Sequence, residues 1–297
     1  MSRSFSPLTG KPYGVKRICL VTGYARSSFY NQSPCQREGR PRGGRRGPKP
    51  LVSDAQLLQS IKDDLDQSPF HGEGHRKVWA RLKYGRGLRI SRKRVLRMMR
   101  EHHLLSPYRR VQGQPRLHTG EIITERPNEM WGTDATRVFT LEDGYAWVFA
   151  AVEHWNAECV GWHVCKRGDR FAAMEPVLMG LKDQFGGLRS DTARGLSLRM
   201  DHGTQYLSDH FQNQIRYWGI APSFAFLEQP QTNGVVERFF RTLKEQIIYG
   251  RAFRNITELR TAVEGFVKNY NEQWRIEKNG FLSPHQARSV HQAKVAA

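Results

Sequence analysis

Residues 131–136, Trp-Gly-Thr-Asp-Ala-Thr, lie in a run of β-branched and aromatic residues, MWGTDATRVF, that decides the fold of the C-terminal half. Two similar runs follow, YAWVFAAV and ECVGWHV, and the turn residues Glu142-Asp143-Gly144 separate the first run from the second. Runs of this composition, joined by short turns, predict three antiparallel strands.

Downstream of these strands the pattern alternates between helix and strand. We expect a helix over 170–185, a strand over 197–201, a helix over 208–218, a strand over 222–226 and a long helix from Val235 to about Tyr249. Antiparallel strands that lead into alternating helices and strands predict a mixed α/β sheet of five strands.

Three carboxylates occupy notable positions in this pattern. Asp134 lies in the first strand, Asp201 ends the fourth strand, and Glu237 lies in the first turn of the long helix. The 35 residues between Asp201 and Glu237 suffice for a helix, a strand and a loop, a path that returns the chain to the same end of the sheet. We therefore expect the three carboxylates to converge.

Converging carboxylates suit hard divalent cations such as Mg²⁺ or Mn²⁺. Two such ions about 3.5–4 Å apart stabilise both the attacking and the leaving oxygen of an in-line phosphoryl transfer. This chemistry needs no nucleophilic side chain, because water or a DNA 3′-hydroxyl is the nucleophile. The sequence thus favours a site with two ions.

The long helix separates an apolar stripe from a polar face. At 100° per residue the stripe contains Val236, Phe239, Phe240, Leu243 and Ile247. Glu237, Arg241 and Lys244 share the open face, where an ordinary salt bridge between residues four apart is the alternative interpretation. The preceding loop QPQTNG is polar, as expected where a nucleic acid strand enters.

Charge is concentrated in the N-terminal part of the chain. The 297 residues include 47 Lys and Arg against 28 Asp and Glu, a net charge of +19. Residues 1–127 hold 27 basic and 9 acidic residues, whereas residues 128–297 hold 20 and 19. This asymmetry predicts a nucleic-acid-binding arm on a nearly neutral body.

The basic arm contains two helix-turn-helix outlines and a linker. Residues 15–32 give two short helical patterns around a glycine, and residues 35–50 are rich in Gly, Pro and Arg. In that linker Arg42, Arg45 and Arg46 are candidate phosphate contacts. A merely solvated linker is the alternative.

A second group of three helices is expected between Ser53 and Ser106. Ser53 and Ser91 are candidate N-caps of its first and third helices. The third helix places Val95 and Met99 on an apolar face and basic residues on the other, as a DNA-recognition helix requires. Those basic residues are Lys93, Arg94, Arg97 and Arg100. A charged, solvated face is the alternative.

Three blocks, WGTDAT, DHGTQY and QTNGVVERFFRTLKEQ, together resemble the signature of the DDE transposases related to retroviral integrases. The stretch from His71 to Leu105 resembles the helix-turn-helix that precedes the catalytic core in OrfB-type transposases of bacterial insertion sequences. The closing YNEQWRIEKNGFLSPHQAR resembles that family's C-terminal tail but departs from its pattern. We therefore assign the tail no role.

The resemblance implies an RNase H-like core in which Asp134, Asp201 and Glu237 bind the metal ions. It also makes residues around the third acid candidates for contact with the DNA end; these are Gln231, Asn233, Arg241 and Lys244. The implied partners are double-stranded DNA, as terminal inverted repeats and target, and further copies of the chain on paired ends. An upstream partner protein fused by frameshifting is also implied, as is a place in the bacterial cytoplasm at the nucleoid.

The predicted organisation has six parts: a helix-turn-helix over 1–34, a basic linker over 35–50, a second helix-turn-helix over 51–105, a linker over 106–127, a catalytic core over 128–250 and a helical tail over 251–297. No apolar run is long enough for a membrane helix, and four cysteines predict no disulfide framework. His71 and His75 have the spacing of a zinc pair, but no Cys-x-x-Cys follows them.

The function predicted is binding of insertion-sequence ends, followed by metal-dependent strand cleavage and strand transfer. Two alternatives stay open. One is a DNA-binding regulator with a non-catalytic core, which leaves the carboxylates without a role. The other is a structure-selective nuclease that cuts DNA but never joins it.

Overall fold

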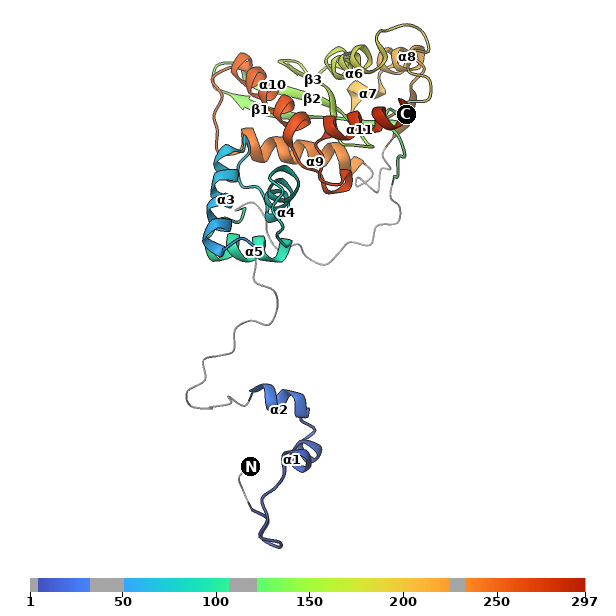
Figure 1. The fold of residues 1–297 in the computed structure, drawn as a ribbon. Helices are drawn as coiled ribbons and strands as arrows, with labels where there is room; N and C mark the ends of the chain where they lie inside the picture. The colour runs from blue at the N-terminus through green and yellow to red at the C-terminus, as the bar shows by residue number, and fades with distance from the viewer. Residues whose placement is uncertain (1–4, 33–50, 107–121, 225–232, 297) are drawn as a thin grey trace. The chain divides into compact units, whose positions relative to one another are not determined.

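The computed structural model describes residues 5–32, 51–106, 122–224 and 233–296. The chain divides into two units, residues 1–50 and 51–297 (Figure 1). In the first unit, α1 (Val15–Thr22) ends at Gly23, whose φ of 67° is left-handed, and α2 (Arg26–Gln32) follows. This is the predicted helix–glycine–helix outline. Arg42, Arg45 and Arg46 lie outside the described residues.

The second unit begins with a group of helices. They are α3 (Asp54–Gln67), α4 (His75–Ala80) with its π-helical continuation η1 (Arg81–Gly85), and α5 (Arg92–Glu101). Both predicted caps form: the Ser53 hydroxyl accepts from the Gln56 amide at 3.2 Å and Ser91 from the Arg94 amide at 3.3 Å. A core of fully buried side chains holds these helices together, including Leu57, Ile61, Val78, Leu82, Val95 and Met99.

A five-stranded sheet follows, with the strand order β3-β2-β1-β4-β5. Its members are β1 (Met130–Thr140), β2 (Gly144–Glu153), β3 (Cys159–Cys165), β4 (Ser197–Met200) and β5 (Ala221–Phe224). The first three strands are antiparallel, and β4 runs parallel to both β1 and β5. The mixed α/β sheet predicted from the sequence is confirmed.

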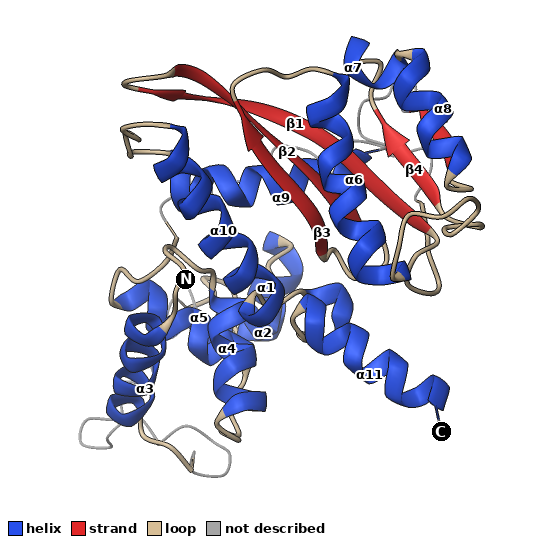
Figure 2. Cartoon of the chain, turned by 90° about the horizontal axis from the view of Figure 1, so that it is seen from above, coloured by secondary structure: helices blue, strands red, loops and turns tan. Residues whose placement is uncertain are grey.

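Helices cover both faces of this sheet (Figure 2). On one face, α6 (Arg170–Phe185) and α8 (Asp209–Tyr217) bury a cluster around Trp131 and Phe149. On the other, α9 (Gly234–Leu243) and α10 (Ile256–Gln273) bury Val148, Val152 and Phe239. Further helical segments of this unit are α7 (Thr204–Leu207), the π-helix η3 (Lys244–Ile248), the 3-10 helix η4 (Glu277–Asn279) and α11 (Pro284–Ala296). No helix of the described residues is long and apolar enough to cross a membrane.

The helices of residues 51–105 pack directly on the sheet domain. Phe70, between α3 and α4, belongs to the core cluster on the α9 face and meets the Trp274 ring edge-on, with centroids 4.7 Å apart. The side chain of Gln246 accepts from the His71 amide at 2.8 Å and donates to its carbonyl at 2.9 Å. Arg76 pairs with Glu277 at 2.6 Å. The two parts therefore share a core.

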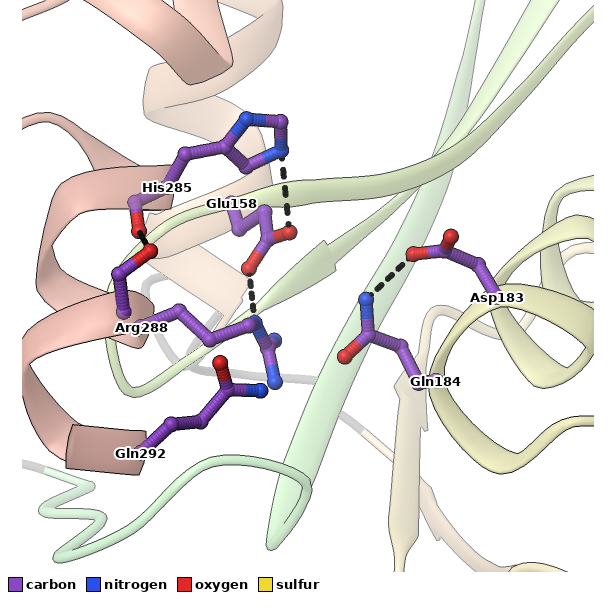
Figure 3. A pocket seen from close by; sticks show the side chains of 7 residues that line it. Glu158, Asp183, Gln184, His285, Arg288 and Gln292 are labelled. Atoms are coloured by element: carbon purple, nitrogen blue, oxygen red, sulfur yellow. Dashed lines mark hydrogen bonds and ion pairs between the residues drawn. The ribbon is translucent and has the colours of Figure 1, made fainter.

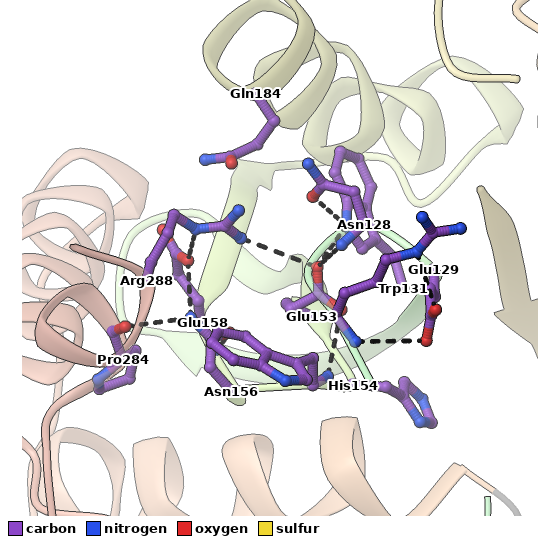
Figure 4. A network of polar contacts seen from close by, with 12 residues as sticks. Asn128, Glu129, Trp131, Glu153, His154, Asn156, Glu158, Gln184, Pro284 and Arg288 are labelled. Carbon is purple, nitrogen blue, oxygen red and sulfur yellow. Dashed lines mark hydrogen bonds and ion pairs between the residues drawn. The ribbon is translucent and has the colours of Figure 1, made fainter. Parts of the chain in front are cut away.

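The C-terminal tail is also integrated into the sheet domain. The Asn271 side chain bonds both the amide and the carbonyl of Cys159 in β3, each at 2.9 Å. Arg288 of α11 bonds Glu158, and His285 lies 3.4 Å from the same carboxylate (Figure 3). Although burial opposes ionisation, these two neighbours hold the pKa of Glu158 below its ordinary value. The tail, for which the sequence indicates no role, fastens the β2–β3 hairpin (Figure 4).

Truncations and one core substitution test the shared core. We expect removal of residues 1–50 to leave the thermal unfolding of the remainder unchanged. Phe70→Ala leaves a cavity beside Trp274 and should reduce the free energy of unfolding by about 3 kcal/mol. Circular dichroism melts measure both effects. A chain of residues 128–297 as stable as residues 51–297 would contradict the shared core.

Candidate active site

The parallel pairing of β1 with β4 places Asp134 beside Asp201. The register joins Met130 to Ser197 and Gly132 to Arg199, which is the last pair of this ladder. Asp134 and Asp201 each lie two residues further along, and Asp201 directly follows the end of β4. Asp134 pairs across to Ala150, which belongs to the α9-side cluster, so the Asp134 carboxylate lies on the α9 face, and the charge of Asp201 acts on it.

Glu237 approaches from the first turn of α9. Val236, Phe239, Phe240 and Leu243 are buried as the predicted stripe requires, and Ile247 is partly buried. Glu237 is left on the open side. Arg241 pairs with Glu245 at 2.9 Å instead of with Glu237, so the helical salt bridge considered for Glu237 does not form in the structure.

The three carboxylates interact electrostatically. The pKa of Asp134 is raised to about 6, by burial first and also by the negative charges of Asp201 and Glu237, whereas the Ala135 amide and Lys244 oppose the rise. Burial also raises the pKa of Glu237. The sheet and α9 therefore gather three acids and one lysine in one region.

The donor chemistry of this region suits a hard cation. Asp201 and Glu237 disfavour the ionisation of Asp134, and divalent positive charge offsets such an effect. As they stand, though, no three Asp, Glu, His or Cys side chains of the described segments lie close enough to share one metal ion. The carboxylates would have to move together to bind it.

The residues predicted to contact DNA near the third acid have different surroundings. Lys244 lies within electrostatic reach of Asp134, and Arg241 is exposed. Asn233 is buried and donates to the Thr133 carbonyl at 3.2 Å, so it faces the sheet. Gln231 lies outside the described residues.

The basic face of α5 is partly neutralised within the chain. Arg94 binds Asp54 at 2.6 Å, and Arg97 binds the same carboxylate at 2.8 Å and Glu101 at 3.3 Å. Lys93 and Arg100 are exposed. Asp54 lies about forty positions earlier in the chain, at the start of α3, so the helical periodicity of α5 alone does not reveal these pairs.

Two buried polar side chains near the carboxylates, Arg199 and His154, were not predicted from the sequence. His154 and the predicted Asn233 lie against Gly132, and Arg199 is the register partner of Gly132. Arg199 precedes Asp201 by two positions, so strand alternation indicates that both share a face. That signal was present in the sequence.

Family models match most of the second unit. An HTH-like domain model matches residues 54–112, and two integrase core domain models match residues 124–230 and 218–284. The transposase InsD for insertion element IS2A/D/F/H/I/K of Escherichia coli is 27% identical over 244 residues, which cover 79% of this chain and 79% of that protein. The InsD transposase for IS2-9 of Escherichia coli K12 is likewise 27% identical and is covered to 77%.

Two solved integrase cores are also similar. The HTLV-2 integrase catalytic core domain in complex with magnesium is 16% identical, with a TM-score of 0.41, and the match covers 55% of this chain and 97% of that chain. The catalytic core domain of BIV integrase is 20% identical, with a TM-score of 0.41, and the match covers 57% and 99%.

The raised pKa of Asp134 predicts a pH-dependent stability difference. Because the folded pKa is about 6 against an ordinary 3.8, the group favours folding below about pH 4, and this contribution is lost as the pH rises through 6. Asp134→Asn removes the buried charge. We expect the variant to be up to about 3 kcal/mol more stable than wild type at pH 7 without metal, and equal to it near pH 4. Denaturant titrations across this range provide the check, and a pH-independent difference would contradict it.

Proposed function

Because the chain belongs to the DDE transposases related to retroviral integrases, which are polynucleotidyl transferases, we propose that it binds insertion-sequence ends and catalyses metal-dependent strand cleavage and strand transfer. The observation that supports this proposal is the raised pKa of Asp134, which burial causes first and to which the charges of Asp201 and Glu237 add. A regulator that only binds DNA does not need acidic side chains near one another, which repel one another and the DNA.

In this proposal the three carboxylates hold two Mg²⁺ or Mn²⁺ ions. The ions supply stabilisation of the attacking and leaving oxygens of the phosphodiester. Asp134 contributes a partly buried carboxylate on a central strand, and Glu237 contributes one on a helix whose apolar side is fixed in the core. Lys244 can neutralise a DNA phosphate at the rim of this site, since it already interacts with Asp134.

The proposed DNA contacts fall into three groups. Lys93 and Arg100 contact the DNA from the exposed side of α5. Arg94 and Arg97 release the Asp54 carboxylate and bind the DNA instead. The linker arginines at 42, 45 and 46 bind phosphates. The third group contacts the DNA end and consists of Gln231, Asn233, Arg241 and Lys244. Assembly of several copies on paired ends, an upstream partner and action at the bacterial nucleoid belong to the proposal as well.

Substitution of the carboxylates tests the chemistry. Asp134→Asn, Asp201→Asn and Glu237→Gln should each abolish cleavage and joining of a labelled element end in Mg²⁺ and preserve end binding, because each removes a metal ligand and no DNA contact. Asp183→Asn, an exposed acid on α6 on the opposite face, is the matched control and should retain activity. Near-normal joining by Glu237→Gln would overturn the catalytic assignment.

The pairing of Asp54 with two arginines gives a test of DNA recognition. Arg97→Ala should reduce affinity for the cognate end by about 1–3 kcal/mol, and affinity for random DNA by less, if Arg97 reads a base. Asp54→Asn releases both arginines and should strengthen binding to either DNA. Salt titrations of binding to cognate and scrambled ends separate these effects. Weaker binding by a folded Asp54→Asn protein would show that the arginines do not turn to DNA.

A further inference from the structure

The end of the β1–β2 hairpin carries exposed aromatic rings on one face. Arg137 pairs across to Trp147, and Phe139 pairs across to Tyr145, so these four side chains share a face of the sheet. Trp147 packs against the cluster beneath α6, which identifies this face as the α6 face. The two strands extend past α6 (Figure 2), and there Phe139 and Tyr145 are 55% and 60% exposed. Exposed apolar side chains that adjoin one another mark an interaction surface, whereas single ones are ordinary.

The opposite face of the hairpin end is covered. Val138 and Ala146 alternate with the exposed residues and are buried in the α9-side core together with Phe253. The Leu141 amide donates to the Phe253 carbonyl at 3.0 Å, which ties the turn of the hairpin to the segment before α10. The exposed rings therefore stand on a backbone that is held from the other side.

A cation lies on these rings. The Arg137 guanidinium is 5.4 Å from the centroid of the Tyr145 ring and 5.5 Å from that of Trp147. Phe139 meets Tyr145 edge-on, with centroids 5.4 Å apart. The backbone of Gly168 closes the inner end of the row, since a Cβ atom there would lie 2.5 Å from the Trp147 ring. Arg137, Phe139 and Tyr145 thus form one continuous surface, which we call the hairpin platform.

The charges around the hairpin platform favour an anionic partner. Arg137 and Arg167, the residue before the glycine on the Trp147 ring, are exposed, and neither guanidinium forms an ion pair within the described part of the chain. Three acids flank the hairpin turn and β3, but each is engaged elsewhere. Glu142 and Asp143 bind the segment before α10 and the first amide of that helix, and Asp169 caps α6.

Unpaired DNA combines the features that this surface selects. Arginine side chains bind phosphates, and exposed aromatic rings stack on base faces, which are accessible where bases are unpaired. A second copy of this chain is a poorer match, because its net charge of +19 would add positive charge to a surface that already has unpaired cations.

The hairpin platform lies a short way along β1 from the carboxylates. β4 pairs with β1 only as far as Gly132, so from Asp134 to Val138 no strand of the described residues adjoins β1 on that side. Arg137 follows Asp134 by three residues, about 10 Å along the strand. A DNA strand at the carboxylates can therefore continue round this edge of β1 to the rings on the α6 face.

We propose that the hairpin platform binds unpaired bases of the DNA strand that the carboxylates cleave, next to the cleaved bond. Phe139 and Tyr145 stack on bases, and Arg137 binds a phosphate between them. This inference rests on the proposed function, because it takes the strand from the carboxylates. The hairpin would hold the strand open on one side of the cleaved bond.

The first experiment measures binding of single-stranded DNA to the full-length chain. The probe is a labelled oligo(dT) of about 16 nucleotides in about 0.5 M NaCl, because high salt weakens the phosphate contacts of the basic arm more than it weakens stacking. The double variant Phe139→Ala/Tyr145→Ala should bind at least about 5-fold more weakly than wild type. Tyr217→Ala removes an exposed ring on α8 and is the matched control, which should bind like wild type.

Two results would overturn the hairpin platform. One is equal affinity of wild type and the double variant for oligo(dT), with circular dichroism showing both to be folded. The other is a change in the sedimentation of the DNA-free protein on substitution of the two rings, which would assign them to a contact between copies of the chain.

The second experiment locates the bases. Element ends with an unpaired flank carry one abasic site at each flank position in turn, and their binding to wild type and to the double variant is compared in Ca²⁺. At one or two positions the abasic site should weaken wild-type binding about 5-fold or more and should not weaken the double variant further. Equal sensitivity of both proteins at every position would contradict the inference. Failure of the proposed function appears differently, as absence of cleavage by wild type on unmodified ends in Mg²⁺.

Discussion

The parallel pairing of β1 with β4 is the constraint on which the rest of the structure depends. It pairs Gly132 with Arg199, and so places Asp134, two residues further along β1, near Asp201, which follows the end of β4. A parallel neighbour requires a crossover connection, which α6 supplies by packing against the opposite face. The strands that carry the site residues on the α9 face are therefore supported on their opposite face by an apolar layer, which contributes no site residue.

This pairing brings together groups that are unfavourable in the folded chain alone. Burial raises the pKa of Asp134 and the charges of Asp201 and Glu237 add to the rise, and the guanidinium of Arg199 is buried without an ion-pair partner among the described residues. Both arrangements lower stability unless a ligand of opposite charge is present. In the proposed function, divalent cations would supply the positive charge that the carboxylates lack.

Local patterns were enough to predict the elements, because strands, amphipathic helices and caps depend on neighbouring residues. The Ser53 and Ser91 caps, the apolar stripe of α9 and the five strands all agree with the sequence. The three acids stood out by their positions in the strand and helix pattern, and the resemblance added their role as metal ligands, but their spacing did not fix their separation. Contacts between distant segments were not predictable in this way. Asp54 at the start of α3 forms ion pairs with Arg94 and Arg97 of α5. Asn271 of α10 accepts a hydrogen bond from the Cys159 amide in β3.

The position of Phe70 has a consequence for how reading and cutting of DNA are coupled. Phe70 is anchored in the sheet domain's core beside Trp274, and Gln246, immediately after α9, binds the backbone of His71. The connection between α3 and α4 therefore touches the helical segment that continues from Glu237. Because of these contacts, helices α3 to α5 cannot rotate freely relative to the sheet domain that carries the carboxylates. The distance from α5 to Asp134 is then a property of the folded unit, so in the proposed function DNA held by α5 would meet the carboxylates at a defined number of base pairs.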